Sequence, residues 1–189
     1  MNKIYLTSDL HFNHDREFIW KPRGFKSCEE MNEAIISKYN SVVEKDDDVY
    51  ILGDMMLGGP STLYYGLKYV ERLNGKLHLV RGNHDSATRW NVFRYLNNVV
   101  EMRNSIYLDY NGYHFYLSHY PSITGSLHQD NLKKMPLNLF GHTHQKESFF
   151  EDMPFMFHVG VDSNDCYPIS IDDAILKMED KMKECKTFL

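Results

Sequence analysis

With 189 residues, 42% of them hydrophobic and 25% charged, the chain has the size and composition of one globular domain with a sizeable core. Its formal net charge of −5 argues against a general nucleic-acid-binding protein, which neutralises phosphates with basic side chains, although a bound metal can reverse the charge of one site. Three cysteines without a CxxC pair argue against a disulfide framework or a thiolate zinc site, and no apolar run approaches the ~20 residues that span a bilayer, so we expect a cytoplasmic protein outside membranes.

Apolar runs predict β-strands at intervals along most of the chain. Asn111-Gly112 separates two of these runs and predicts a type I′ hairpin between them. The strand-like runs are residues 3–8, 48–54, 76–83, 105–110, 113–119, 136–142 and 155–160.

Helices are predicted between the early strands and at the end of the chain. They are expected after the capping box of Ser27 and Glu30, after Ser61, over residues 86–96, and from Ser170 with Asp173. Strands and helices thus alternate first, hairpins follow, and a helix closes the chain. This order predicts a single α/β domain over residues 1–189, in which two mixed sheets pack face to face with helices outside.

Polar residues collect where five of the predicted strands end. These clusters are Asp9-Leu-His11, Gly53-Asp54, Gly82-Asn-His-Asp85, Ser118-His119 and Gly141-His-Thr-His144. Residues i and i+2 of an extended segment point the same way, so we expect Asp9 to face one cleft with His11, and His142 to do so with His144. The glycines allow tight turns and close approach of the backbone.

Each cluster alone has an ordinary structural explanation: a turn at Gly53, a helix cap in residues 82–85, a hydrogen-bonded structural histidine at His119. Together they offer imidazole, carboxylate and amide ligands and no thiolate, which suits manganese, iron, zinc, nickel or cobalt better than calcium. Two cations that share a bridging carboxylate need about seven or eight protein ligands, and the clusters supply that number.

The motifs DLH, GD, GNHD, SH and GHTH, in this order, resemble the signature of the calcineurin-like metallophosphoesterases. The resemblance runs from Thr7 to about Asp162. It is closer to the small single-domain bacterial and phage-type members, which often read DLHFGH and VGVD where this chain has DLHFNH (9–14) and VGVD (159–162). The resemblance implies a four-layer αββα sandwich with two mixed β-sheets.

The resemblance also implies a dinuclear metal site and a role for each residue that matches the signature. Asp9, His11 and His144 would hold one ion, Asn83, His119 and His142 the other, and Asp54 would bridge both. Manganese is the first expectation, with iron, zinc, nickel and cobalt as alternatives. A metal-bridging hydroxide would attack phosphorus, and His84, outside the coordination sphere, would act as general acid or stabilise the transition state.

The implied reaction is hydrolysis of a small phosphodiester or phosphomonoester, nucleotides included, without stable binding of nucleic acid. The GDxxDRG motif of the larger protein Ser/Thr phosphatases is missing, because Leu57 and Gly58 stand where its second aspartate and arginine would fall. We therefore do not expect protein phosphatase activity. Asp85 follows His84 directly, and adjacent side chains rarely converge, so we do not expect it to orient that histidine.

Two further residues are candidates for contact with substrate. His14 is placed to reach the phosphate or a bound water, or else is a loop residue bonded locally, and Arg23 binds phosphate or is solvated surface. His78, His114, His128 and His158 match nothing in the signature and are expected to be structural. The alternative function is a non-catalytic metal-binding scaffold on the same fold, and the oligomeric state stays open.

Overall fold

The computed structural model describes residues 2–59, 61–124, 131–151 and 153–187. Its first sheet has five strands in the order β4-β3-β2-β1-β9. The first four are parallel to their neighbours, and β9 is antiparallel to β1. Their bounds are β1 (Ile4–Thr7), β2 (Asp48–Leu52), β3 (Lys76–Val80), β4 (Val99–Arg103) and β9 (Ile169–Ser170).

The second sheet has four strands in the order β5-β6-β7-β8. The β5–β6 pair is antiparallel and the other two pairs are parallel. Asn111 and Gly112 both have positive φ, 49° and 80°, as the predicted type I′ turn requires. The strands are β5 (Ser105–Tyr110), β6 (Tyr113–Ser118), β7 (Pro136–Phe140) and β8 (Met156–His158). The prediction of an α/β fold with two mixed sheets is therefore confirmed.

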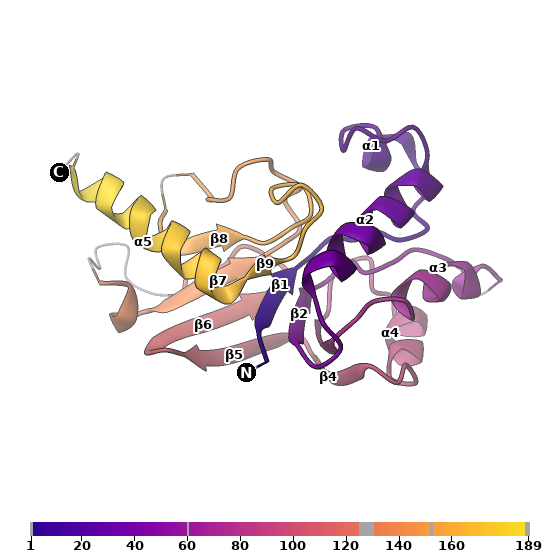
Figure 1. Cartoon of the computed structure of the whole chain (residues 1–189), viewed down its shortest axis with the longest axis horizontal. Helices are drawn as coiled ribbons and strands as arrows, with labels where there is room; N and C mark the ends of the chain where they lie inside the picture. Colours follow the sequence, from indigo (N-terminus) through magenta and orange to yellow (C-terminus); the bar gives the residue numbers. More distant parts are fainter. Residues whose placement is uncertain (1, 60, 125–130, 152, 188–189) are drawn as a thin grey trace.

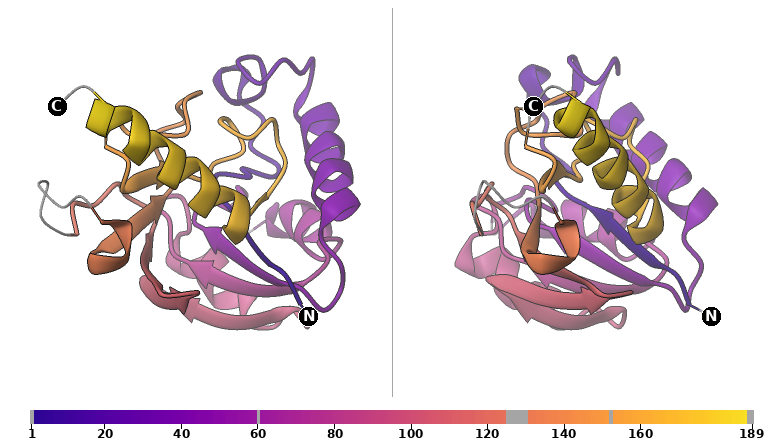
Figure 2. Two further views of the ribbon diagram at one scale, coloured as in Figure 1. Left: turned by 60° about the vertical axis from the view of Figure 1, so that its left-hand side comes forward. Right: turned by 90° about the vertical axis from the view of Figure 1, so that its left-hand side faces the viewer.

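The helices lie in two groups. Figure 1 shows α2 (Cys28–Val42), α3 (Leu63–Val70) and α4 (Ala87–Phe93) on one side of the strands and α5 (Ile171–Thr187) on the other. The short α1 (Glu17–Trp20) precedes α2, and a 3₁₀ turn, η1 (Leu132–Lys134), precedes β7. The left view of Figure 2 separates α2 from α5, with β1 between them. None of the helices in the described ranges is both long and apolar enough to cross a membrane.

Helix ends follow the predicted capping chemistry with one shift. The hydroxyl of Ser27 accepts a hydrogen bond from the Glu30 amide at 3.1 Å, and that of Ser170 accepts one from the Asp173 amide, also at 3.1 Å. Such bonds satisfy amides that the first turn leaves without partners. The second predicted helix begins one residue later than expected, because Thr62 rather than Ser61 is its N-cap residue.

Side chains that alternate along the strands divide the core in two. On β2, Val49 and Ile51 belong to a buried cluster with α2 and α3, whereas Tyr50 and Leu52 belong to a second cluster. That second cluster holds apolar residues of both sheets and of α5, including Met178. The two sheets are therefore joined by one apolar layer, and helices cover the far face of the first sheet.

The ends of β1, β2, β6 and β7 meet at one edge of this arrangement. The amide of Asp9 donates to the carbonyl of Gly53, and the amide of Gly141 donates to that of His119, each at 3.0 Å. Ser8 pairs with Gly160 in an isolated parallel bridge. The polar clusters of the sequence are thus brought together from both sheets.

Candidate metal centre and active site

Asp9 lies just beyond β1 with its two carboxylate oxygens in different environments. Oδ2 accepts hydrogen bonds from the Ser8 hydroxyl at 2.6 Å and from the His142 amide at 2.8 Å. Oδ1 is buried and has no hydrogen-bond partner among the described residues. Since a buried carboxylate oxygen without a partner is costly, Oδ1 is available to a bound cation.

His11 presents a second buried atom of this kind to the same place. Its Nδ1 lies 3.0 Å from Nδ1 of His14. Its Nε2 has no hydrogen-bond partner in the described parts of the chain and lies 3.9 Å from Asp9 Oδ1. One ring nitrogen is thus held by His14, and the other is left facing the free oxygen of Asp9. A second partner that holds the ring from behind is typical of metal-ligating histidines.

Asp54, beyond β2, lies between two histidines. Its Oδ1 accepts a hydrogen bond from the His84 amide at 2.7 Å. Its Oδ2 is 3.6 Å from Nε2 of His11 and 3.5 Å from Nε2 of His119. One oxygen fixes the carboxylate and the other faces both imidazoles, so the position suits a bridging ligand.

Asn83, His119 and His142 form a second group beside Asp54. His119 donates from Nδ1 to the Leu52 carbonyl at 2.8 Å, so its Nε2 carries a lone pair when the ring is neutral. That nitrogen lies 2.8 Å from Asn83 Oδ1, and Nδ1 of His142 lies 2.9 Å from the same oxygen. Lone pairs that face each other at this distance need a proton or a cation between them.

His144 is held from behind by a buried ion pair. Its Nδ1 lies 2.8 Å from Asp162 Oδ2, and its Nε2 is 3.8 Å from Asp9 Oδ1. Asp162 in turn accepts from Nε and Nη2 of Arg23, each at 2.9 Å. We call Arg23 and Asp162 the clamp. Asp162 is the last residue of the VGVD motif, and no role was predicted for it.

The contacts of Arg23 argue against the predicted contact with phosphate. Its side chain is only 2% exposed. Besides Asp162, the guanidinium donates to the carbonyls of Asp9 and Leu10 and to the sulfur of Met31. These bonds occupy all five N–H donors, so Arg23 is a structural support of the candidate ligands rather than a free phosphate binder.

The protonation states suit metal binding. Burial lowers the pKa of His11 well below its usual value, and that of His14 to about 4, so both rings are neutral, as metal ligation requires. Burial raises the pKa of Asp54. For Asp162, burial is outweighed by the bonds from His144 and Arg23, which hold its pKa well below the usual range.

The backbone at these residues is strained. The φ angles of Asp9, His11, Asp54, His142 and His144 are 57°, 50°, 56°, 70° and 51°, in the left-handed region that side-chain-bearing residues rarely adopt. Such strain persists where the surrounding structure enforces it, commonly at functional sites.

Two of the motif glycines are needed for close approach. A Cβ on Gly82 would collide with the Asp54 carboxylate, and a Cβ on Gly141 would collide with Ser8 and with Oδ2 of Asp9. The expectation that glycine permits close approach here is therefore confirmed, although at these two positions the reason is space and not positive φ.

The donor atoms fit divalent ions. Ligand atoms of Asp9, His11 and His144 lie within 4.8 Å of one another, and so do those of Asp9, Asp54 and His119. The partnerless atoms of Asp9 and His11 belong to the first of these groups. Neutral imidazole with carboxylate is the donor set expected for manganese, iron, zinc, nickel or cobalt.

A cavity of about 470 Å³ opens over these atoms. His84 and His14 both line it, with ring centroids 5.6 Å apart, and the His84 ring is 5.2 Å from that of His11. The remaining lining residues are His11, Phe18, Ile19, Pro22, Asp54, Asn83, His142, His144, Lys146 and Asp162. His14 therefore lies in a loop beside the candidate centre and is bonded locally to His11, and its contact with phosphate stays a prediction.

Arg89 supports the backbone of His84, and Asp85 supports the neighbouring strand ends. Arg89 on α4 donates from Nε to the His84 carbonyl and from Nη1 to the Gly58 carbonyl, each at 2.8 Å. Asp85 accepts from the amides of Gly82, Asp54 and Met55, so it ties two strand ends together and does not orient His84. A carboxylate inside GNHD was the only sequence signal for this role.

Three of the described histidines match nothing in the signature, and they bond residues other than the candidate ligands. His78 lies between Asp48 and Glu101, and His114 bonds Asp109. His158 is fully buried, with Nδ1 2.8 Å from the Ser163 hydroxyl. His128 lies outside the described residues.

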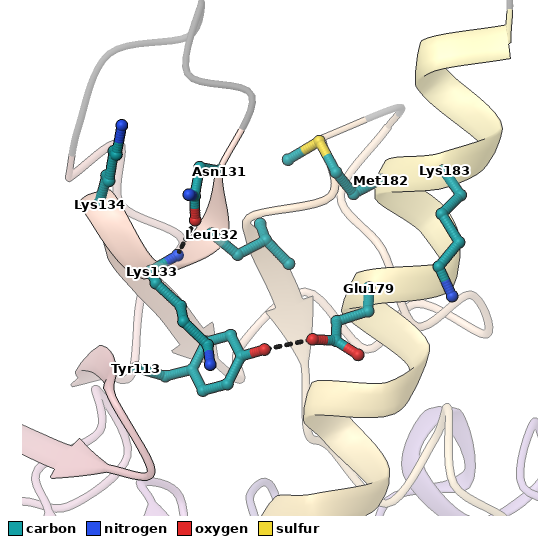
Figure 3. A pocket seen from close by; sticks show the side chains of 8 residues that line it. All are labelled: Tyr113, Asn131, Leu132, Lys133, Lys134, Glu179, Met182 and Lys183. Carbon is teal, nitrogen blue, oxygen red and sulfur yellow. Dashed lines mark hydrogen bonds between the residues drawn. The ribbon is translucent and has the colours of Figure 1, made fainter.

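A roomier hollow, of about 570 Å³, lies between η1 and α5 (Figure 3). There the Tyr113 hydroxyl bonds Glu179, and Nζ of Lys133 lies 4.8 Å from the centre of the Tyr113 ring. Among the described residues that line it there is no histidine, and Glu179 is the one carboxylate. The candidate metal ligands therefore line the smaller cavity and not this one.

Comparison with known proteins shows the family of the chain. The family model for calcineurin-like phosphoesterases matches residues 2–174. Uncharacterized protein MJ1445 of Methanocaldococcus jannaschii is 34% identical over 99% of this chain and 97% of its own length, and the Gene 66 protein of Mycobacterium phage L5 is 28% identical over 86% and 88%. A protein of unknown function from Aquifex aeolicus, AQ665, shares the fold with a TM-score of 0.68 at 23% identity, over 93% of this chain and 99% of that one. The chain belongs to the calcineurin-like phosphoesterase family, whose members are metal-dependent hydrolases of phosphoric esters.

Proposed function

We propose that this phosphoesterase uses two divalent transition-metal ions, manganese by preference, to hydrolyse a small phosphodiester or phosphomonoester. The observation that carries the proposal is the pair of buried atoms without partners, Asp9 Oδ1 and His11 Nε2, which face each other at 3.9 Å. Burying a polar atom without a partner is unfavourable, and a cation bound between these two atoms would offset that cost.

We assign two sets of ligands. One ion is held by Asp9, His11 and His144, and the other by Asn83, His119 and His142. Asp54 joins the two sets, since its Oδ2 lies about equally far from Nε2 of His11 and Nε2 of His119, at 3.6 and 3.5 Å. Each set combines imidazole with an oxygen ligand, as transition metals prefer.

Bound ions of this kind lower the pKa of water and neutralise charge on phosphoryl oxygens. His84 is placed to protonate the leaving oxygen, because its ring lines the cavity while its amide is fixed by Asp54 and its carbonyl by Arg89. His14 lines the same cavity and is placed to contact the phosphoryl group.

The test measures hydrolysis of bis-p-nitrophenyl phosphate and p-nitrophenyl phosphate by metal-stripped protein, with and without manganese. We expect turnover that depends on manganese, and the ratio of the two rates distinguishes a diesterase from a monoesterase. Asp54→Asn should weaken the binding of both ions and abolish turnover. His84→Ala should retain two ions per chain and lower kcat by about 10²–10⁴-fold, the usual contribution of a general acid.

Two outcomes contradict the proposal. Loss of metal from His84→Ala would show that His84 is a ligand. Absence of turnover with manganese, iron, zinc, nickel and cobalt, despite two ions bound per chain, would favour a non-catalytic scaffold.

A further inference from the structure

We propose that Phe18, Ile19 and Pro22, here called the apolar lip, bind a planar aromatic group of the substrate, so that the preferred substrate is a nucleotide ester whose base stacks on Phe18. This inference rests on the proposed function and names the substrate class of the same site. It comes from the outer wall of the cavity and not from the candidate ligands.

Phe18 extends the candidate centre outward by a chain of ring contacts. The His14 ring lies 5.0 Å from that of His11, and the Phe18 ring lies 5.8 Å from that of His14 at an interplanar angle of 85°. A group esterified to a phosphate at the centre therefore lies within reach of Phe18. The edge-to-face contact with His14 fixes the orientation of the phenyl ring.

Phe18 is a large apolar side chain exposed to solvent at the rim of this cavity. Within the four residues of α1, Ile19 is buried at 7% exposure, whereas Phe18 is 69% exposed. Phe18 and Ile19 also line the cavity, as does Pro22. Large apolar side chains that gather at a cavity with a few convergent polar groups are typical of ligand-binding walls.

The charge of the outer wall favours a base attached to phosphate. Of the described lining residues, the only carboxylates are those of Asp54 and Asp162, which belong to the candidate centre and the clamp. Lys146 lines the cavity and donates from Nζ to the Pro22 carbonyl at 3.2 Å, so it places a cation at the lip. An apolar ring beside a cation matches a nucleotide, which combines a π-face with negative charge.

The size of the cavity points the same way. At about 470 Å³ it is within the range of sites that enclose whole small molecules, roughly 300–1,000 Å³. A phosphoryl group has only a phosphorus atom and its oxygens, so most of this space serves the rest of the substrate.

The experiment compares adenosine 5′-monophosphate with ribose 5-phosphate as competitive inhibitors of bis-p-nitrophenyl phosphate hydrolysis by the manganese-loaded protein. The two probes carry the same phosphate on the same sugar and differ only in the base. We expect the nucleotide to bind about 10-fold more tightly, as one stacked base provides. Phe18→Ala should remove this preference without changing the inhibition constant of ribose 5-phosphate. Phe18→Tyr, which keeps an aromatic ring, should retain the preference.

Tyr107→Ala is the matched control, because Tyr107 on β5 is 75% exposed and does not line the cavity. Equal inhibition by both probes, or a preference that survives Phe18→Ala, would overturn the inference while leaving the phosphoesterase proposal intact. If the protein hydrolyses neither aryl ester, calorimetric binding of the two probes to the manganese-loaded protein decides the inference separately.

Discussion

Asp162 shows how one side chain can act on the candidate centre without touching it. Its carboxylate accepts from Nδ1 of His144 on one side and from Arg23 on the other. A carboxylate behind a ligating histidine fixes the ring and raises its basicity. Burial lowers the pKa of His144, but the bond to Asp162 and the negative charges of Asp9 and Asp162 together outweigh it and raise the pKa above its usual value.

We predict that Asp162→Asn weakens metal binding about 10- to 100-fold, the usual loss when such a partner is removed. Metal titration of the stripped protein measures the affinity, and circular dichroism reports whether the variant is folded. Asp165→Asn is the control, since its carboxylate is exposed and pairs with Lys38 at the surface. Equal metal affinity in the Asp162 variant and the wild type would show that the clamp has no effect on His144.

His158 makes stability depend on pH. Burial lowers its pKa to about 4, whereas an unfolded histidine titrates near 6.5. Between these values the unfolded chain binds the proton and the folded chain does not, so the free energy of unfolding falls as the pH falls from about 6.5 to about 4. For one group this amounts to about 3 kcal/mol.

We therefore expect the free energy of unfolding of His158→Asn to fall by about 3 kcal/mol less than that of the wild type over that interval. Denaturant titrations of the metal-free proteins measure it. The comparison is made between pH 7 and pH 4, with each protein referred to its own value at pH 7. A parallel decline of both proteins would rule out titration of His158 as the cause.

The sequence predicted which residues face one another better than it predicted the backbone conformation that brings them together. Asp9 and His11 do face one place, but the reason given, an extended backbone, is wrong, because both residues are left-handed. The clamp was beyond sequence reasoning: Arg23 and Asp162 are 139 residues apart, and no local pattern pairs them.

Among the elements, those with strong local signals were predicted and those defined by tertiary pairing were not. The β5–β6 hairpin and the helix caps follow from turn and capping residues. β4, β9 and α1 were missed. β9 has two residues and exists only through its pairing with β1, and β4 lies at the edge of its sheet with partly exposed side chains.

The hairpin turn offers a test of backbone conformation alone. Gly112 has a φ of 80°, and the nearest atom to a Cβ there would be Cδ of Lys133, at 4.0 Å. Gly112→Ala should therefore lower the free energy of unfolding by about 1–2 kcal/mol through left-handed strain. Chemical denaturation measures the change.

Gly59→Ala serves as the matched glycine substitution, because Gly59 has no positive φ and its Cβ would meet nothing within 4 Å. We expect its free energy of unfolding to change by less than about 0.5 kcal/mol. Equal losses in the two variants would show that the left-handed conformation is not the source of the cost.

At the scale of the whole molecule, the candidate ligands come from both sheets. Asp9, Asp54 and Asn83 follow strands of the first sheet, and His119 and His142 follow strands of the second. Ions bound between them would hold the two sheets together only in the folded chain. Binding that is restricted to the folded state stabilises it by mass action.

We accordingly predict that manganese at 100 times its Kd adds about 2.7 kcal/mol per site to the free energy of unfolding. Thermal melts with manganese and with EDTA measure the effect as a shift in Tm. Asp54→Asn should reduce the shift in Tm, because the Asp54 carboxylate lies between the two groups of ligands. A Tm independent of manganese would contradict a metal centre that joins the sheets.

The left-handed backbone at Asp9, His11, Asp54, His142 and His144 also bears on how this chain can be engineered. At each position glycine would relax the backbone, while the side chain it deletes is the one proposed to hold metal. A selection for stability of the metal-free protein would thus favour glycine there and return proteins that lack the proposed ligands. Any such selection needs metal binding as a second criterion.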